Sequence, residues 1–394
     1  MRNGDSAVDS TAISLVRTTF KAVAAIDDGP ARLTQSFYSV LFANNPDVRE
    51  FFPAAMEAQR ERLVHAIAYV IDQLDDPEPV LLFLAQLGRD HRKYGVVDAH
   101  YTAVGNALIF ALKNFAGNEM WTDEVDNAWR EAIALIASVM MEAANAETGP
   151  ATWTGTVVEH KQVLQDVAVV RLQLDRPMEY GAGQYVSVTV PGRPRMWRYL
   201  SPAIPSNPEG QIEFHVRRVS GGWVSPAMVG QTNLGDTWVM GSPLGALGVD
   251  RTQNRDMLMI GSGTGIAPLR AQLMEMAMRA NNPNVHVFVG GNYPCDLYDI
   301  ETLWQLSLTN PWLTVIPVSE EDTNPWFHLD PIPTPPAGMY KRITGKVSAV
   351  AADFGDWSNH DIQIVGSAST IQTAKFRLQA KGVPVENMRH DPLY

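Results

Sequence analysis

The stretch DMLMIGSGTGIAPLRAQLMEM, residues 256–276, decides the fold of the C-terminal third of the chain. A short apolar run precedes closely spaced glycines, and apolar residues at helical spacing follow them. This order predicts a strand, a tight loop and a helix. Glycines there let backbone N–H groups approach a pyrophosphate at the start of the helix. We therefore expect a dinucleotide-binding loop, with a purely structural turn as the alternative; its residues are Gly261, Gly263, Thr264, Gly265 and Pro268.

Similar β-rich runs follow this stretch. They are VHVFVGG (285–291), WLTVIPVS (312–319) and DIQIVGS (361–367), and the last of them leads into a second helical pattern. Alternating strands and helices favour a parallel sheet. We predict an α/β nucleotide-binding domain over residues 253–394.

The region before residue 253 has a different apolar period. Val186, Val188 and Val190 alternate with polar residues, and so do the apolar residues of IEFHVRRV (212–219). A period of two is typical of half-buried strands. We predict an antiparallel β-barrel over residues 149–252.

The first 148 residues are predicted to be entirely helical. Leu33, Phe37 and Leu41 follow a helical stripe, as do Leu63, Ile67 and other residues up to Leu74, and the residues from Trp129 to Met140. No strand-like alternation interrupts these segments. The polar, Gly- and Pro-containing segment NAETGPATW (145–153) is predicted to be a linker.

Composition excludes several classes of protein. The chain has 394 residues, a net charge of −12 and a single cysteine, Cys295. An intrachain disulfide and a Cys-based metal or iron–sulfur site are therefore impossible. The negative charge argues against nucleic acid or an anionic membrane as a partner. With no apolar run long enough to span a bilayer and no apolar signal core near the N-terminus, we expect a cytoplasmic protein.

Three motifs in the barrel region precede the glycine loop in a fixed order. They are GQY (183–185), RYLSPA (198–203) and GGWVS (221–225). This order resembles the ferredoxin-reductase family, whose barrel holds FAD and whose second domain binds a nicotinamide dinucleotide. The resemblance implies that Arg198 pairs with the flavin pyrophosphate, as a guanidinium fork can. It also implies FAD contacts from other residues of the three motifs, namely Tyr185, Tyr199, Leu200, Ser201, Gly222 and Ser225.

Three positions depart from that family at the nicotinamide end. Leu200 stands at the family's Tyr, Val365 at its Cys, and Leu393 where related proteins carry a Phe. Because neighbouring strand residues face opposite sides, we do not expect Tyr199 to replace the Tyr. We expect FAD to bind but hydride transfer from the nicotinamide to be slow. No Arg or Lys follows VFVGGNYP (287–294), which favours NADH over NADPH.

The helical half contains a histidine in the charged run LGRDHRKYGV (87–96). Alone, His91 is typical of a solvated helix end. However, a helical domain joined to a FAD/NAD reductase resembles the flavohemoglobins over essentially the whole chain. That resemblance implies that His91 is the proximal ligand of haem b, with Tyr101 as its supporting residue. It places Tyr38, Gln59, Phe52 and Leu63 on the distal side, where the Tyr38 hydroxyl can donate a hydrogen bond to bound O2.

One globin position also departs from the family. Flavohemoglobins carry a Glu on the last globin helix that strengthens the proximal His through a hydrogen-bond network. The corresponding residue is Ala144, and Glu142 lies about 200° around the helix from it. We therefore expect a weaker proximal contribution to O2 chemistry.

The leading functional hypothesis is an enzyme that passes electrons from NADH through FAD to haem and oxidises nitric oxide with O2 to nitrate. A second hypothesis keeps the architecture but uses another small-molecule donor such as D-lactate. A third is a haem-based oxygen or redox sensor that the reductase half resets. The sequence gives no prediction of oligomeric state.

Overall fold

The computed structural model describes residues 10–74, 76–252 and 255–391. They form two compact units. The first contains the described residues up to Thr152 together with Pro194–Met196, and the second contains the remaining described residues from Trp153 onward. Leu393, one of the predicted site residues, lies outside the described residues.

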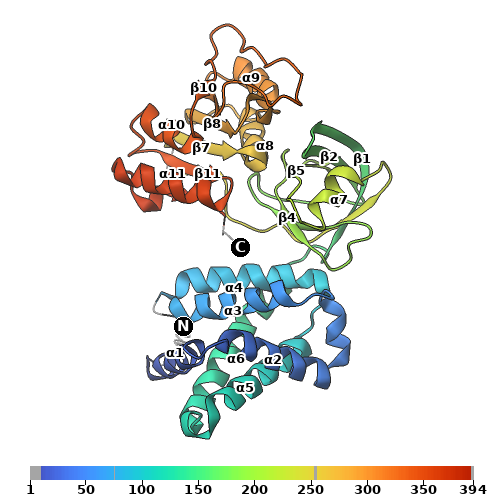
Figure 1. The fold of residues 1–394 in the computed structure, drawn as a ribbon, viewed down its shortest axis with the longest axis vertical. Coiled ribbons are helices and arrows are strands. Elements are labelled where there is room, and N and C mark those ends of the chain that lie inside the picture. Colours follow the sequence, from blue (N-terminus) through green and yellow to red (C-terminus); the bar gives the residue numbers. More distant parts are fainter. Residues whose placement is uncertain (1–9, 75, 253–254, 392–394) are drawn as a thin grey trace. The chain divides into compact units, whose positions relative to one another are not determined.

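The first unit is helical throughout its described residues (Figure 1), as predicted. Its core collects the apolar stripes of several helices, including Leu33, Phe37 and Leu41, with Trp129 and Ala132 from the last helix. The predicted stripe that ends at Leu74 extends past its helix, which stops at Asp72. The helices are α1 (Ser10–Ala24), α2 (Gly29–Asn44), α3 (Glu57–Asp72), α4 (Pro77–His91), α5 (Asp98–Met120) and α6 (Asp123–Ala146), with short 3-10 helices at Pro46–Phe51 and Arg92–Tyr94.

The second unit begins with a six-stranded antiparallel sheet in the order β4-β3-β6-β1-β2-β5. An antiparallel bridge between Pro202 and Phe214 links the segment after β4 to β5, so that the sheet nearly closes into a barrel. Ile212, Phe214 and Val216 of β5 are buried, as their alternation predicts. The strands are β1 (Trp153–Leu164), β2 (Val167–Leu174), β3 (Val186–Thr189), β4 (Arg198–Leu200), β5 (Gln211–Arg217) and β6 (Thr237–Met240), and the short helix α7 spans Ser225–Gly230.

A parallel sheet in the order β10-β9-β8-β7-β11-β12 completes the second unit. Alternate residues of β7 enter different cores: Leu258 and Ile260 pack with residues of α10 and α11, and Met257 and Met259 pack with α8 and α9. Helices therefore cover both faces of the sheet, as expected for strands with continuous apolar runs. The elements are β7 (Met257–Ser262), α8 (Ile266–Ala277), β8 (Val285–Gly291), α9 (Ile300–Thr309), β9 (Leu313–Ser319), β10 (Ile343–Thr344), α10 (Val347–Phe354), β11 (Asp361–Val365), α11 (Ala368–Ala380) and β12 (Met388–Arg389).

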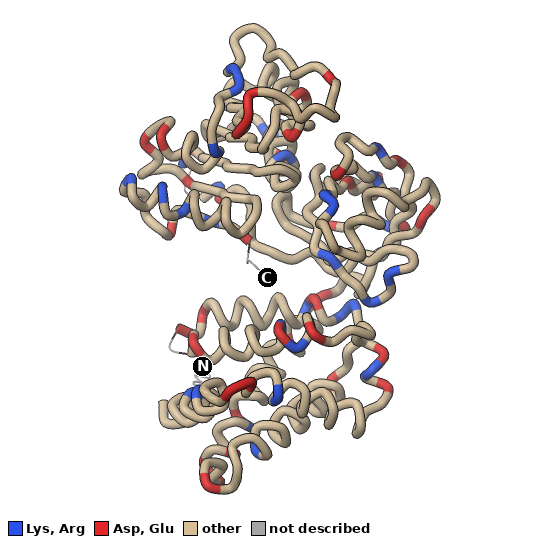
Figure 2. The backbone as a smooth tube through the Cα atoms, viewed as in Figure 1, with Lys and Arg blue, Asp and Glu red and all other residues tan. Residues whose placement is uncertain are grey.

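The chain thus has the predicted fold class: a helical domain, an antiparallel barrel and a parallel α/β domain. Figure 2 shows acidic and basic residues interspersed along both units in this view. Within the described ranges, no single helix combines the length and apolar character needed to cross a bilayer. The bent pair Pro77–Tyr94 and Asp98–Met120, at 114°, meets that test by length and composition alone.

Candidate functional site

His91 is the last residue of α4, and its ring is fixed by the helix itself. Its Nδ1 lies 2.7 Å from the carbonyl oxygen of Leu87, one turn earlier. A carbonyl can only accept, so Nδ1 carries the hydrogen and Nε2 is left as the ligating atom. Burial lowers the pKa of His91, which favours the neutral form that binds metals. These properties fit a proximal haem ligand, because the porphyrin supplies the other four in-plane ligands.

Tyr38 is buried on α2 among aromatic rings. Its ring meets Phe52 edge to face, with centroids 5.4 Å apart, and Leu63 packs against the same core. Burial raises the pKa of Tyr38 to about 12, although a hydrogen bond with Gln59 and the charge of Arg60 oppose this rise. The hydroxyl therefore stays protonated and can donate. The structure thus brings together the four residues predicted for the distal side.

Tyr101 and Ala144 give His91 little further support. Burial raises the pKa of Tyr101, but among the described residues its hydroxyl has no hydrogen-bond partner. Helices α4 and α6 approach closely at Gly88, where an added Cβ would lie 2.2 Å from the Met140 carbonyl oxygen. Ala144, one turn beyond Met140, supplies no carboxylate. The His91 ring is therefore oriented by its hydrogen bond to the Leu87 carbonyl and by an edge-to-face contact with the Tyr94 ring, whose centroid lies 5.9 Å away.

Two other histidines of this unit have structural roles. His65 is exposed, and its Nδ1 contacts the Glu61 carbonyl at 2.8 Å. His100 accepts from the Val97 backbone N–H at 3.1 Å and helps to begin α5. The described part of the chain holds no group of three or more His, Cys, Asp or Glu side chains that could bind a metal ion.

The second unit contains a cleft of about 470 Å³ between the barrel and the parallel sheet. Ser201, Tyr199 and Leu200 line it from the barrel, and the β7–α8 loop lines it from the other side. The cleft lies at the carboxyl ends of β7 and β11, where the strand order reverses, which is the usual ligand site of such sheets. The loop residues at the cleft are Ser262, Gly263, Thr264, Gly265, Ala267 and Pro268.

The β7–α8 loop can pass the end of β11 because residue 265 has no side chain. A Cβ at Gly265 would lie 2.5 Å from the Val365 carbonyl oxygen, closer than such atoms approach. Gly263, at φ 57°, adopts the left-handed conformation that glycine tolerates. The result is a backbone cradle above the helix start, which fits a pyrophosphate. Gly261 lies at the end of β7, against Leu269 and Ile266.

The flavin side of the cleft differs from our expectation for Tyr199. Strand alternation predicted that Tyr199 would turn away from the site, but it lines the cleft beside Leu200. Because β4 ends at Leu200, little strand remains there to impose alternation. The Tyr199 ring packs edge to face on Tyr185, with centroids 5.2 Å apart. A tyrosine is therefore retained at the cleft despite Leu200.

Of the residues expected at the flavin pyrophosphate, Ser201 lines the cleft, whereas Arg198, Gly222 and Ser225 lie outside its lining. The Arg198 guanidinium donates to the Trp197 carbonyl at 2.7 Å. The Ser225 hydroxyl accepts from the Val219 backbone N–H at 3.0 Å and closes the turn that contains Gly222. An added Cβ at Gly222 would lie 3.0 Å from the Val219 carbonyl oxygen, so this turn is tight. The turn and the Arg198 guanidinium are the kinds of groups that bind the phosphates of FAD.

Comparison with known proteins agrees with this geometry. Residues 35–140 match the Globin family, residues 154–248 the Oxidoreductase FAD-binding domain family, and residues 259–330 the Oxidoreductase NAD-binding domain family. The fold is similar to that of the flavohemoglobin from Malassezia yamatoensis with bound FAD and heme, with a TM-score of 0.79 over 98% of this chain and 99% of that one, at 16% identity. The chain has the domains and the fold of a flavohemoglobin.

Two relatives extend the comparison. The Flavohemoprotein of Bordetella pertussis is 28% identical over 290 residues, which cover 67% of this chain and 71% of the relative. The Flavohemoprotein of Bacillus anthracis is 25% identical over 418 aligned residues, covering 91% of this chain and 98% of the relative. Like a flavohemoglobin, the chain has a globin domain, which implies haem, and separate FAD- and NAD-binding domains.

The cleft of this flavohemoglobin fold also includes residues that sequence reasoning missed. His215 and Arg217 line it from β5, and Asn292 and Asp296 line it from the segment after β8. A signal was available: Glu213, His215 and Arg217 alternate with the apolar residues of β5, so they form one polar face of that strand. At the end of β11, Val365, Gly366 and Ser367 complete the lining.

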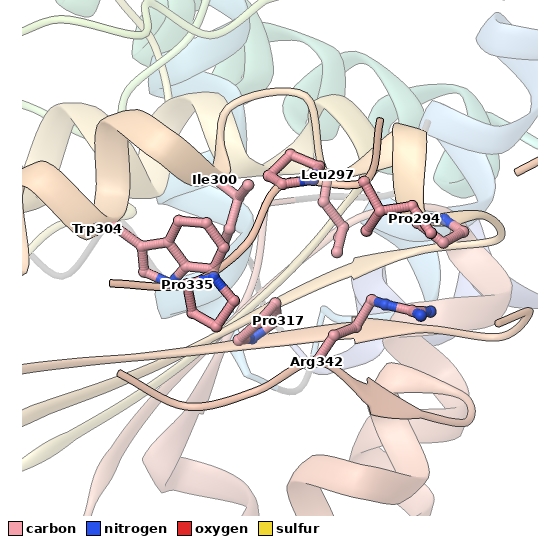
Figure 3. Close-up of a pocket in the computed structure, with 9 residues that line it drawn as sticks. Pro294, Leu297, Ile300, Trp304, Pro317, Pro335 and Arg342 are labelled. Atoms are coloured by element: carbon pink, nitrogen blue, oxygen red, sulfur yellow. The ribbon is translucent and has the colours of Figure 1, made fainter. Parts of the chain in front are cut away.

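A second, much smaller cavity lies beneath the Pro-rich loop of the NAD-binding domain. It measures about 20 Å³, and Trp304, Pro317 and Pro335 line it together with Leu297 and Arg342 (Figure 3). A volume of this size holds about one water molecule. We interpret it as a packing defect under residues 330–338 rather than a cofactor site.

Proposed function

We propose that the chain is an enzyme that takes electrons from NADH, passes them through FAD to haem, and uses them to oxidise nitric oxide with O2 to nitrate. Each nitric oxide consumed requires one electron, so one NADH supports two. Two observations in the globin domain carry the proposal. The Nε2 atom of His91 is available as a metal ligand, because Nδ1 bonds to the Leu87 carbonyl. The buried hydroxyl of Tyr38 stays protonated and can donate a hydrogen bond. We also propose domain boundaries at 1–148, 149–252 and 253–394.

When bound, FAD would accept a hydride and release single electrons, and haem would supply the iron at which O2 and nitric oxide react. The protein's own residues have simpler tasks. His91 would hold the haem iron through Nε2, and the Tyr38 hydroxyl, which has a hydrogen bond with Gln59, would donate a hydrogen bond to bound O2. Phe52 and Leu63 keep that pocket apolar. In the cleft, Ser201 and Tyr199 would contact the flavin, and the backbone around Gly265 would hold the dinucleotide.

We favour NADH over NADPH because no Arg or Lys follows VFVGGNYP and because an acidic segment, Glu320 to Asp322, lies beside the segment after β8. The backbone N–H groups of Glu320 and Glu321 bond to the carbonyl oxygens of Gly291 and Asn292, so this acidic segment lies directly beside the cleft lining. The guanidinium of Arg342 also lies at this segment, where it donates to the carbonyl oxygens of Glu321 and Asp322 at 2.8 and 2.9 Å. The three carboxylates outnumber this one cation and would repel a 2′-phosphate.

Val365 and Leu200, at the nicotinamide end of the cleft, support two expectations. FAD content should be normal, because the residues expected to contact its pyrophosphate are present. Flavin reduction by NADH should be slower than in a relative with the usual Cys and Tyr. The same departures favour, as a second candidate, a flavohemoglobin-like enzyme with another small donor such as D-lactate.

Anaerobic stopped-flow reduction separates these candidates. The full protein, loaded with haem and FAD, is mixed with NADH, NADPH or D-lactate while flavin bleaching and the haem Soret band are recorded. Air-saturated buffer and nitric oxide are then added, and nitrate is measured. NADH-driven haem reduction followed by nitrate formation, with two nitric oxide molecules consumed per NADH, is expected. Reduction by D-lactate alone would replace the proposed donor, and haem reduction without nitrate formation would favour the sensor.

A further inference from the structure

Three alternate residues on the polar face of β5 contact the NAD-binding domain. Glu213, His215 and Arg217 lie on this face, and Glu213 and His215 are almost fully buried. Buried charged side chains are rare unless they are paired. Within the barrel, Glu213 pairs with Arg171 and Arg217 pairs with Asp166. Their other partners come from α8 and from the segment between β8 and α9, so the NAD-binding domain also covers this face of the strand.

Glu213 is the centre of the first contact. Its Oε1 accepts from Arg270 Nη1 on α8 at 2.8 Å, and its Oε2 accepts from Arg171 Nη2 on β2 at 2.6 Å. Burial alone would raise the pKa of Glu213. Hydrogen bonds and charges from its partners, which include Arg270 and Arg171, outweigh burial and lower this pKa to about 2. The carboxylate is therefore ionised and joins a barrel arginine to an arginine of the NAD-binding domain.

His215 forms the second contact. Its Nε2 lies 3.0 Å from Arg270 Nη1, and its Nδ1 lies 3.0 Å from the Tyr298 hydroxyl. A guanidinium can only donate, so Nε2 accepts and Nδ1 donates to Tyr298. This assignment satisfies both 3.0 Å contacts. Nε2 and Glu213 Oε1, which lie 3.3 Å apart, then both accept from the same Arg270 Nη1. Arg270 thus bonds to Glu213 and His215, two residues of the same polar face of β5.

Arg217 forms the third contact, which reaches the cleft lining directly. Its Nη2 donates to Asp296 Oδ1 at 3.0 Å. The other carboxylate oxygen of Asp296 accepts from the backbone N–H groups of Asn292 and Tyr293 at 3.0 and 2.9 Å. The ion pair between the domains therefore fixes the segment after β8, which lines the cleft.

We propose that Glu213, His215 and Arg217, here called the β5 clamp, are positioning residues that hold the NAD-binding domain in register with the barrel. Buried ion pairs add little net stability, because desolvation offsets their attraction, but they can fix one arrangement among several. Hydride transfer needs the two rings within about 3–3.5 Å, and a shift of about 1 Å can cost roughly 100-fold in rate. The clamp lies beside the cleft in which those rings would meet, so its effect falls on this step. This inference rests on the proposed function.

The test uses Glu213→Gln in the full protein loaded with haem and FAD. We expect unchanged FAD and haem content, and unchanged flavin reduction by dithionite. The rate of flavin reduction at saturating NADH should fall about 10- to 100-fold, with a weaker long-wavelength charge-transfer band between nucleotide and flavin. Glu159→Gln is the matched control. It removes the other, half-exposed carboxylate on Arg171, 3.2 Å away, without touching the NAD-binding domain. Its rate should stay within about twofold of wild type.

A second readout does not depend on the donor. Amide hydrogen exchange over residues 292–299 should become faster in Glu213→Gln and stay unchanged in Glu159→Gln. If wild type is not reduced by NADH, the proposed function fails while this exchange measurement still tests the clamp. Should Glu213→Gln not fold, Arg270→Gln leaves Glu213 paired with Arg171 and is expected to act in the same way. Unchanged exchange, or a wild-type rate at saturating NADH despite faster exchange, would overturn the proposal.

Discussion

The globin unit and the reductase unit build their sites from different parts of the chain. In the globin unit, side chains at helical spacing converge, and one backbone carbonyl, that of Leu87, orients His91. In the reductase unit, the cleft is made of glycine backbone and of the domain contacts beside it. The globin site depends on side chains, so substitutions that remove side-chain atoms should impair it. The cleft depends on close backbone approach at glycines, so substitutions that add a side chain there should impair it.

The largest effect should follow loss of the single ligand. In His91→Ala, haem content should fall by more than about 10-fold, because even residues that only support a metal ligand cost 10- to 100-fold in affinity. FAD content serves as the internal control, since the reductase unit is separate. The pyridine haemochromogen assay and flavin absorbance measure both. Full haem content in the variant would show that another residue binds the iron.

Removing one oxygen atom on the distal side should have the next largest effect. Tyr38→Phe removes the donor, and a hydrogen bond to a charged group contributes about 1.5–3 kcal/mol. O2 dissociation from the haem should therefore become roughly 10- to 100-fold faster. Flash photolysis or stopped-flow displacement gives the rate. An unchanged rate would reduce Tyr38 to a packing residue.

In the reductase unit, adding one methyl group at Gly265 should be enough to weaken NADH binding. Gly265→Ala places a Cβ 2.5 Å from the Val365 carbonyl oxygen, and such overpacking costs about 1–3 kcal/mol. We expect NADH affinity to fall about tenfold, measured by titration of the oxidised protein with NAD+ or by the NADH dependence of flavin reduction. Gly248→Ala is the control, because its Cβ would meet an ordinary contact at 3.7 Å. Equal affinities in both variants would contradict the cradle.

The smallest effect is expected at Tyr101. Its hydroxyl has no hydrogen-bond partner among the described residues, so Tyr101→Phe should change the O2 dissociation rate by less than about twofold. Comparing Tyr38→Phe with Tyr101→Phe therefore distinguishes a hydroxyl that donates a hydrogen bond to bound O2 from one that only packs. A large change in Tyr101→Phe would mean that its hydroxyl supports His91 once haem is bound.

The sequence predicted which residues share a helix face better than it predicted the direction of residues in short strands or the contacts between domains. Helical spacing of Leu33, Phe37 and Leu41 and of the residues from Trp129 to Met140 was sufficient for the globin helices, since a period of 3.6 fixes which residues share a face. The roles of His91 and Tyr38 came from the resemblance to flavohemoglobins. Strand alternation failed at Tyr199, because β4 is only three residues long. The polar face of β5 was visible as alternation, but its partners Arg270 and Asp296 lie far along the chain. No local pattern predicts such a contact between domains.

The raised pKa of Tyr38 has a consequence for how the globin unit responds to alkali. A phenol with a pKa of about 12 stays almost fully protonated up to about pH 11. The Tyr38 hydroxyl therefore does not lose its proton in the pH range in which most haem proteins are studied. O2 affinity should show no alkaline Bohr effect from this residue, so any pH dependence of O2 release below that point must come from another group.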